Sequence, residues 1–207
     1  MLFATQGAYK GVRAAETAAL VAWSAVANGD RLGGLVFSGA EHHEQRPALG
    51  VRAALRLLQT IASESLWEPA GGDAVSEVDA EHALLRLTRV ARPGSLIFLL
   101  SDFDAFDTPA AAQLAQLTRH NDVVLISVHD PLEADLPPAG RYRVSDGRRI
   151  LSVESGDPQR RERYRRHFAA RQTQLQGFCR DHGVTLLSLS TADEPLAVLQ
   201  RGLGLRR

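Results

Sequence analysis

The 207-residue sequence contains a single cysteine, Cys179. One thiol cannot form an intrachain disulfide, so a buried core must hold the fold and we expect a reducing compartment. The longest nearly apolar run, residues 95–100, is far shorter than the roughly 20 apolar residues of a membrane-spanning helix. The N-terminus also lacks the basic start and apolar stretch of a signal peptide. These absences predict a cytoplasmic protein without a membrane segment.

An excess of charge of either sign is also missing. Lysine and arginine together number 24, as do aspartate and glutamate, so the formal net charge is zero. A neutral chain has no general attraction to nucleic acid or to an anionic membrane. The apolar fraction of 44% is sufficient for a buried core and excludes a disordered chain. With no linker or repeat, the whole chain, residues 1–207, is interpreted as a single domain.

Apolar residues recur at helical spacing in several stretches. Turn and cap residues bound them: Asn28-Gly29 ends the first helix, Thr108-Pro109 starts a later one, and Gly183 ends the longest. On the first helix Trp23 is expected to be a core anchor, and on the second Val51 and Leu55 are expected to face inward. The predicted helices cover residues 10–28, 50–61, 76–90, 108–120, 158–182 and 195–203.

Four apolar segments between these helices predict strands, at residues 32–37, 96–100, 122–128 and 184–189. Residues 96–100 are apolar throughout, which is typical of a strand covered on both faces. The glycines of the first segment, Gly33 and Gly34, indicate close approach by another backbone. Alternating helices and strands predict an α/β fold of three layers, a doubly wound, mostly parallel sheet with helices on both faces.

Two shorter segments leave alternatives open. Residues 41–47 are polar and fit either a loop or a short edge hairpin, whereas residues 142–153 resemble a hairpin that turns at Asp146-Gly147. The run from His129 to Glu133 follows a strand and is expected to form a turn in which Asp130 caps the backbone.

The order of several short motifs resembles the bacterial family known as domain of unknown function 58. The matching blocks are residues 10–16, 22–23, 28–37, 99–103, 119–123, 130–133, 136–137 and 140. Each block is short, but their order and spacing together cover nearly the whole chain. The resemblance implies a von Willebrand factor A-like (VWA-like) fold.

Domains of this kind often carry a metal-ion-dependent adhesion site, which binds Mg²⁺ through oxygen ligands at the carboxyl ends of the strands. Asp102 matches the ligand that the resemblance implies after the strand 96–100. A loop threonine is also implied, but residues 71–77 contain none, and only Asp73 or Ser76 can substitute. The metal-site prediction is therefore Asp102, with Asp73 and Ser76 as weaker candidates in an incomplete site.

The remaining ligands of the family lie in an Asp-x-Ser-x-Ser motif on a first, central strand, and Met1 aligns just after that motif. We therefore expect this chain to lack that strand, which in the implied topology lies between residues 32–37 and 96–100. Each buried backbone group left without a partner costs roughly 1–3 kcal/mol. Because most of the metal ligands lie on the missing strand, Mg²⁺ is expected in a complete protein rather than in this chain.

The resemblance implies a function that is not enzymatic. Members of the family commonly occur beside MoxR-type AAA+ ATPases, which predicts a protein-interaction module with an incomplete adhesion site and a MoxR-type partner. No nucleic-acid partner is expected. Nucleic-acid binding is nevertheless a further alternative, because six arginines lie close together on one predicted helix. They are Arg160, Arg161, Arg163, Arg165, Arg166 and Arg171.

The second alternative is a Mg²⁺-dependent phosphatase of the haloacid dehalogenase type. Such enzymes place a nucleophile and an acid/base after a strand, here Asp102 and Asp104. Phe106 stands where a threonine or valine is usual, and the motif lies in the middle of the chain. A simpler interpretation is that Asp107 or Thr108 caps the next helix while the other carboxylates face solvent.

Overall fold

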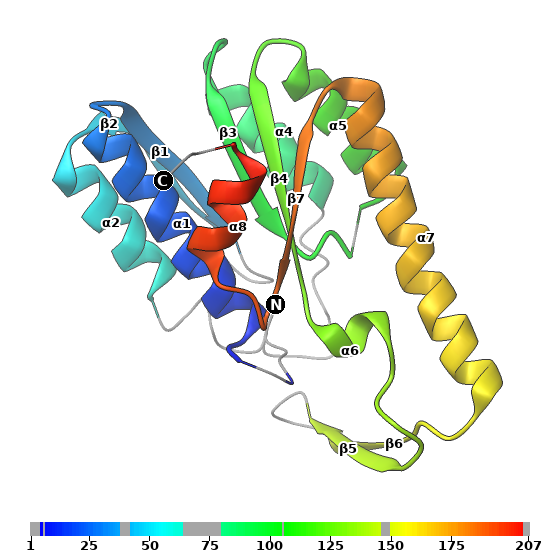
Figure 1. Ribbon diagram of the computed structural model, residues 1–207. Helices are drawn as coiled ribbons and strands as arrows, with labels where there is room; N and C mark the ends of the chain where they lie inside the picture. The colour runs from blue at the N-terminus through cyan, green and yellow to red at the C-terminus, as the bar shows by residue number, and fades with distance from the viewer. Residues whose placement is uncertain are drawn as a thin grey trace.

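The computed structural model describes residue 5 and residues 7–37, 42–63, 80–104, 106–145 and 150–204. Its centre is a sheet of three parallel strands in the order β3-β4-β7 (Figure 1). These strands are β3 (Leu96–Ser101), β4 (Asp122–His129) and β7 (Thr185–Ser190). The middle strand, β4, is the most deeply buried of the three. The chain therefore has an α/β fold.

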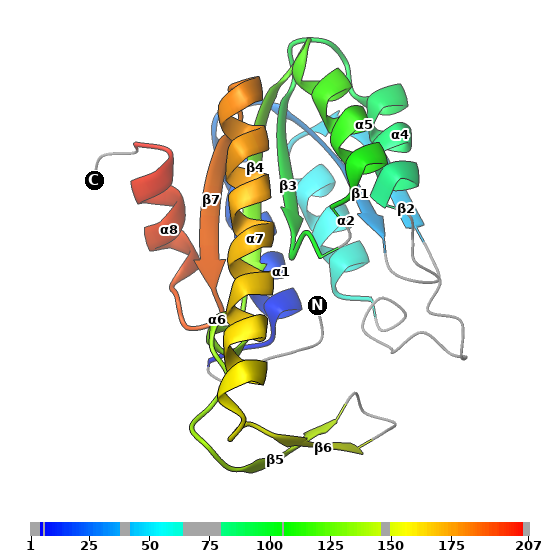
Figure 2. The ribbon, with the colours of Figure 1, turned by 90° about the vertical axis from the view of Figure 1, so that its right-hand side faces the viewer.

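Helices cover both faces of this sheet (Figure 2). On one face Leu125 of β4 belongs to a core cluster with residues of α5 (Thr108–Thr118) and α7 (Pro158–His182). On the other face Ile126 packs with residues of α8 (Pro195–Gly202) and α1 (Lys10–Ala27). Successive side chains of β4 thus pack into the cores on opposite faces of the sheet, because the side chains of a strand point alternately to its two faces.

Cap residues mark the helix boundaries, and the sequence indicated Asp107 and Gly183 among them. Asp107 accepts a hydrogen bond from the backbone N–H of Ala110 and caps α5, with proline in the first turn. Asp157 caps α7 in the same way, and Gly183 ends it in the left-handed conformation, with φ of 66°. Glycine adopts this conformation without the steric cost that a Cβ brings.

The first two strands form a separate two-stranded sheet. β1 (Arg31–Phe37) pairs with β2 (His42–Leu49) in antiparallel orientation, and α2 (Val51–Ile61) follows directly. The hairpin alternative for this region is therefore the one observed. A Cβ on Gly33 would lie 2.9 Å from the carbonyl oxygen of Gln45, which confirms that a neighbouring backbone approaches this glycine.

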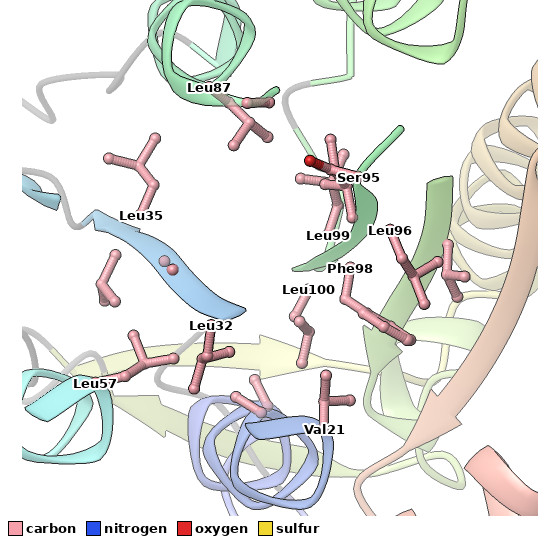
Figure 3. Close-up of a pocket in the computed structure, with 18 of the residues that line it drawn as sticks. Val21, Leu32, Leu35, Leu57, Leu87, Ser95, Leu96, Phe98, Leu99 and Leu100 are labelled. Atoms are coloured by element: carbon pink, nitrogen blue, oxygen red, sulfur yellow. The ribbon is translucent and has the colours of Figure 1, made fainter. Parts of the chain in front are cut away.

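Residues 32–37 and residues 96–100 lie in different sheets among the described residues, so the parallel sheet has three strands and does not include residues 32–37. Among the described residues β1 pairs only with β2, and β3 pairs only with β4. The two strands nevertheless run in the same direction, with a gap between them (Figures 1 and 2). β3 packs on both faces as predicted, with Ile97 in the core cluster on one face and Phe98 and Leu100 against the cluster on the other (Figure 3), although Leu96 at its start is 60% exposed.

Three side chains expected in the core are also at the surface. Trp23 is 42% exposed, and Val51 and Leu55 are both nearly half exposed. The buried positions of these two helices include Ala22 on α1 and Leu57 on α2. Apolar residues occupy a wider arc of each helix than the arc that packs against the core. The spacing of apolar residues therefore predicts the buried face of a helix only approximately.

The remaining elements complete the chain. α4 (Ala80–Val90) packs beside α5, α6 (Pro131–Ala134) is a single turn after β4, and β5 (Arg141–Ser145) pairs with β6 (Ile150–Glu154) as an antiparallel hairpin. None of the described helices is both long and apolar enough to cross a membrane.

Candidate functional site

Polar side chains gather where the three parallel strands end. Asp102 follows β3, Asp130 follows β4, and Thr191 follows β7. Because parallel strands present their carboxyl ends at one edge of the sheet, these residues lie near one another, and α1 begins beside them (Figure 1). We call this region the carboxyl edge.

Asp130 is the buried centre of the carboxyl edge. Its carboxylate accepts hydrogen bonds from the backbone N–H of Thr5 at 2.8 Å, the Thr5 hydroxyl at 2.5 Å and the Thr191 hydroxyl at 2.7 Å. It also accepts from the N–H of Leu132 at 2.9 Å, and its own N–H donates to Glu133 at 3.1 Å. Burial alone would raise the pKa of this carboxyl, but the hydrogen bonds lower it below the ordinary value. Asp130 thus joins the segment before α1 to the ends of β4 and β7.

Lys10 is a buried cation at the same edge. Its side chain is 6% exposed, and its Nζ donates to Asp102 Oδ2 at 3.0 Å and to Glu133 Oε1 at 2.5 Å. Burial opposes the charge of Lys10, but the two carboxylates raise its pKa above 10.5. Burial likewise opposes the charge of Asp102, and the Lys10 ammonium lowers the pKa of that carboxyl. Lys10 and Asp102 are therefore charged at neutral pH. We call Lys10, Asp102 and Glu133 the Lys10 bridge.

The second aspartate after β3 lies outside this bridge. The Asp104 side chain is 73% exposed and forms an ion pair with Arg171 of α7. Phe103, between the two aspartates, has a φ of 51°, which is uncommon for a residue other than glycine. Its N–H donates to Ser101 Oγ at 3.0 Å, which stabilises the turn. The turn separates the surroundings of Asp102 and Asp104.

A bound metal ion is not favoured by the described residues. They include no group of three or more His, Cys, Asp or Glu side chains arranged to hold a metal ion. At Asp102 the ammonium of Lys10 already supplies the compensating positive charge. Asp73 and Ser76 lie outside the described residues, so the proposed ligand set of Asp102, Asp73 and Ser76 stays a prediction. While Lys10 keeps this position, the geometry does not fit Mg²⁺.

Sequence reasoning found Asp102 and correctly predicted that Asp130 caps a turn, but it missed Lys10 and the ion pair between Lys10 and Glu133. The signal for Asp130 and Glu133 was available, because Asp-x-x-Glu at a helix start is a capping box, and the structure shows both of its hydrogen bonds. Lys10 offered no comparable signal, since its partners are 92 and 123 positions away in the sequence.

The chain is similar in sequence to mycobacterial proteins that are described as uncharacterized. Uncharacterized proteins of Mycobacterium bovis and Mycobacterium tuberculosis are 30% identical over 197 residues, covering 94% of this chain and 60% of their own length. The chain therefore spans about 60% of the curated relatives that it matches.

Two solved structures have a similar arrangement. The conserved hypothetical protein BatB of Bacteroides thetaiotaomicron matches with a TM-score of 0.56 and 14% identity, over 93% of this chain and 85% of BatB. An aerotolerance-related membrane protein of Bacteroides fragilis matches with a TM-score of 0.49 and 13% identity, over 94% of this chain and 89% of its own. The BatB likeness supports the α/β fold and nothing finer.

The family is established by the match to a family model. The model of the family described as "Protein of unknown function DUF58" matches residues 1–174, which include the carboxyl ends of β3 and β4 and the whole Lys10 bridge. This chain belongs to the DUF58 family.

Proposed function

We propose that this chain is a non-catalytic protein-interaction module that binds its partner at the carboxyl edge. The observation that carries the proposal is the Lys10 bridge, in which a buried ammonium holds Asp102 and Glu133. General acid or base catalysis works best with a pKa near the operating pH. Here the pKa of Lys10 is raised and that of Asp102 is lowered, away from neutrality. Such groups are suited to fixing the shape of an edge.

In the finer form of the proposal, the fold is VWA-like and the carboxyl edge is a degenerate metal-ion-dependent adhesion site. Asp102 supports this, because it follows a parallel strand at the edge where open α/β sheets bind ligands. Lys10 then takes the part of the metal ion as the compensating charge. The partner implied by the family resemblance is a MoxR-type AAA+ ATPase.

The phosphatase alternative requires Asp102 as nucleophile and Asp104 as acid/base. The observed contacts favour neither role, because Asp102 is bound to Lys10 and Asp104 is exposed and paired with Arg171.

Binding to a purified MoxR-type ATPase from the same genome, measured by isothermal titration calorimetry, tests the proposal. Ala192 is exposed in the turn after β7, at the carboxyl edge, whereas Arg92 is exposed in the turn before β3, at the opposite end. We expect Ala192→Trp to weaken binding by about tenfold or more, because a bulky side chain blocks close approach. Arg92→Trp is the matched control. Equal effects of the two variants, or no binding by the wild type, would contradict the proposal.

The enzymatic alternative has its own test. The purified chain, with and without Mg²⁺, is assayed for hydrolysis of p-nitrophenyl phosphate. We expect no turnover above the buffer rate. Hydrolysis that Asp102→Asn abolishes would replace the interaction module by the phosphatase.

A further inference from the structure

A hairpin and part of a helix project beyond the central sheet. β5, β6 and the first turns of α7 lie past the ends of the strands, apart from the layers that cover the sheet (Figures 1 and 2). Among the described elements, β5 and β6 pack extensively only on each other. In α7, residues 162–167 are all exposed, whereas Leu175 and Cys179 farther along belong to the core. We call residues 135–167 the arm.

Polar contacts fasten the arm at its base. Arg165 Nε and Nη2 donate to the carboxylate of Asp135 at 2.9 and 3.0 Å, and Arg161 donates to the same carboxylate at 3.1 Å. Ser155 is buried, and its hydroxyl donates to the carbonyl oxygen of Pro138 at 2.6 Å. These contacts join the segment before the hairpin to the segment after it and to α7. The surface of the arm is therefore formed before a partner arrives, which lowers the entropic cost of binding.

The arm carries an excess of positive charge. Its sequence contains nine arginines and five acidic residues, which gives a formal net charge of +4 in a chain whose total is zero. The rest of the chain is therefore net acidic, and the arm differs from it in charge as well as in position. A local surplus of one charge attracts partners of the opposite charge and speeds their association.

Several arginines of the arm are accessible to a partner. Arg143 of β5 and Arg163 of α7 are exposed, and neither forms an ion pair with another described residue. Arg160 and Arg166 lie about one turn to either side of Arg163, on the same side of the helix, and form only exposed pairs. Exposed ion pairs contribute little to stability. The carboxylate of a partner can therefore replace an internal one at little cost.

The distribution of charge favours an acidic polypeptide over nucleic acid. Glu154, Asp157 and Glu162 lie among the exposed arginines and pair with three of them. A DNA duplex would place its regularly spaced phosphates against these carboxylates, whereas a polypeptide can carry neutral or basic residues there. A second copy of the chain is also not favoured, because the carboxylates of its carboxyl edge are buried or already paired with Lys10.

We propose that the arm binds an acidic segment of a partner protein, whose carboxylates pair with Arg143 and Arg163 and with the exposed arginines beside them. The arm borders the carboxyl edge but contains none of the residues that form it. This inference goes beyond the proposed function, because it concerns a second surface and does not require a partner at the carboxyl edge.

The test uses a fluorescein-labelled synthetic peptide, EEAAKEEAAKEEAAKEE, in which glutamates outnumber lysines. Its binding to the full chain is measured by fluorescence anisotropy. We expect saturable binding at low salt that weakens by about tenfold or more when the salt concentration is raised to about 200 mM, because exposed charges are screened. The control peptide, KKAAEKKAAEKKAAEKK, has the two charges exchanged and should not bind.

Two double variants locate the binding. Arg143→Glu with Arg163→Glu alters the arm, whereas Arg92→Glu with Arg119→Glu makes the same change of charge in exposed turns at the opposite end of the sheet. We expect the arm variant to weaken peptide binding by about tenfold or more, and the control variant by less than about threefold. Ala192→Trp at the carboxyl edge should leave peptide binding unchanged, which separates this inference from the proposed function.

Circular dichroism checks that each variant is folded. If the arm variant is unfolded, Arg160→Glu with Arg166→Glu replaces it, since both side chains are exposed.

Four outcomes would overturn the proposal. The first is no saturable binding of the acidic peptide at millimolar concentration. The second is equal weakening by the two double variants, which would indicate nonspecific attraction. The third is tighter binding of a DNA duplex than of the peptide, lost in the arm variant, because the arm would then be a nucleic-acid interface. The fourth is a concentration-dependent dimer, seen by light scattering, that the arm variant abolishes, because the occupant would then be a second copy.

Discussion

The ammonium of Lys10 lies 3.0 Å from Oδ2 of Asp102, although 92 positions separate the two residues in the sequence. Lys10 is in the first turn of α1, and Asp102 directly follows β3. Their contact ties the first helix to the carboxyl end of an outer strand of the central sheet. Glu133, 2.5 Å from the same ammonium, extends the connection to α6.

Replacing Lys10 by methionine should destabilise the fold. The change removes the cation and leaves two carboxylates, which are 21% and 18% exposed, close together without compensation. Breaking a buried ion pair by removing one partner costs about 3–5 kcal/mol. We therefore expect the free energy of unfolding, measured by urea denaturation, to fall by about 3 kcal/mol. Arg166→Met is the control, because its pair with Glu162 is exposed and should contribute less than about 1 kcal/mol.

The contribution of Asp102 should depend on pH in a defined direction. Its pKa is lower in the folded chain than the ordinary 3.8. The stabilisation is therefore fully present above pH 3.8 and is lost as the pH falls through the lower folded pKa. We expect the difference in unfolding free energy between wild type and Asp102→Asn to be constant near neutrality and to shrink on acidification below pH 3.8. A difference that grows on acidification would show that Asp102 is not stabilised in its charged form.

The parallel part of the fold was predictable from the sequence because its signals are local. Buried strands such as residues 122–128 appear as apolar runs, and caps such as Asp107 and Gly183 fix helix ends through their own side chain or backbone conformation. These features need no knowledge of distant residues.

The pairing of β1 and the position of Lys10 depend on distant residues and were not predictable in the same way. The sequence of residues 32–37 predicts an apolar strand. It does not indicate whether that strand pairs with β2 alone or with a second strand as well. A lysine in the first turn of a helix is ordinarily solvated, and only the assembled sheet brings two carboxylates to it. Trp23 illustrates the same limit, since its apolar character indicated burial but the helix directs it to solvent.

Asp130 should contribute more stability than an ordinary helix cap. Its carboxylate accepts four hydrogen bonds, from both Thr5 donors, Leu132 and Thr191, and it is fully buried. Asp130→Ala leaves those donors without their acceptor, so we expect a loss of about 3 kcal/mol or more in thermal or urea unfolding. Asp107→Ala, which removes one capping hydrogen bond, should cost about 1 kcal/mol. Similar losses for the two variants would show that the network around Asp130 adds little to its capping role.

Cys179 should be chemically inert in the folded chain. Its side chain lies in the core beneath α7, and burial raises the pKa of the thiol to about 11. The thiolate is the reactive form, so at pH 8 an ordinary thiol with a pKa near 8.5 reacts far faster. We expect Ellman's reagent to modify Cys179 at pH 8 only slowly in the native chain and rapidly in guanidinium chloride. Equal rates under both conditions would place Cys179 at an accessible surface.

The arginines of α7 should not confer binding to nucleic acid. Arg161 and Arg165 both pair with Asp135, and Arg166 pairs with Glu162 on its own helix. Internal partners reduce the charge available to phosphates, and the chain as a whole is neutral. We expect no retention of a fluorescent DNA duplex in filter binding at low salt. A nucleic-acid interface would be favoured if DNA were retained and retention weakened with salt. The logarithm of the binding constant would then fall with the logarithm of the salt concentration, with a slope of roughly −0.9 for each phosphate contacted. In that case the double change of Arg165 and Arg166 to alanine should reduce the slope by about two, because two phosphate contacts would be lost.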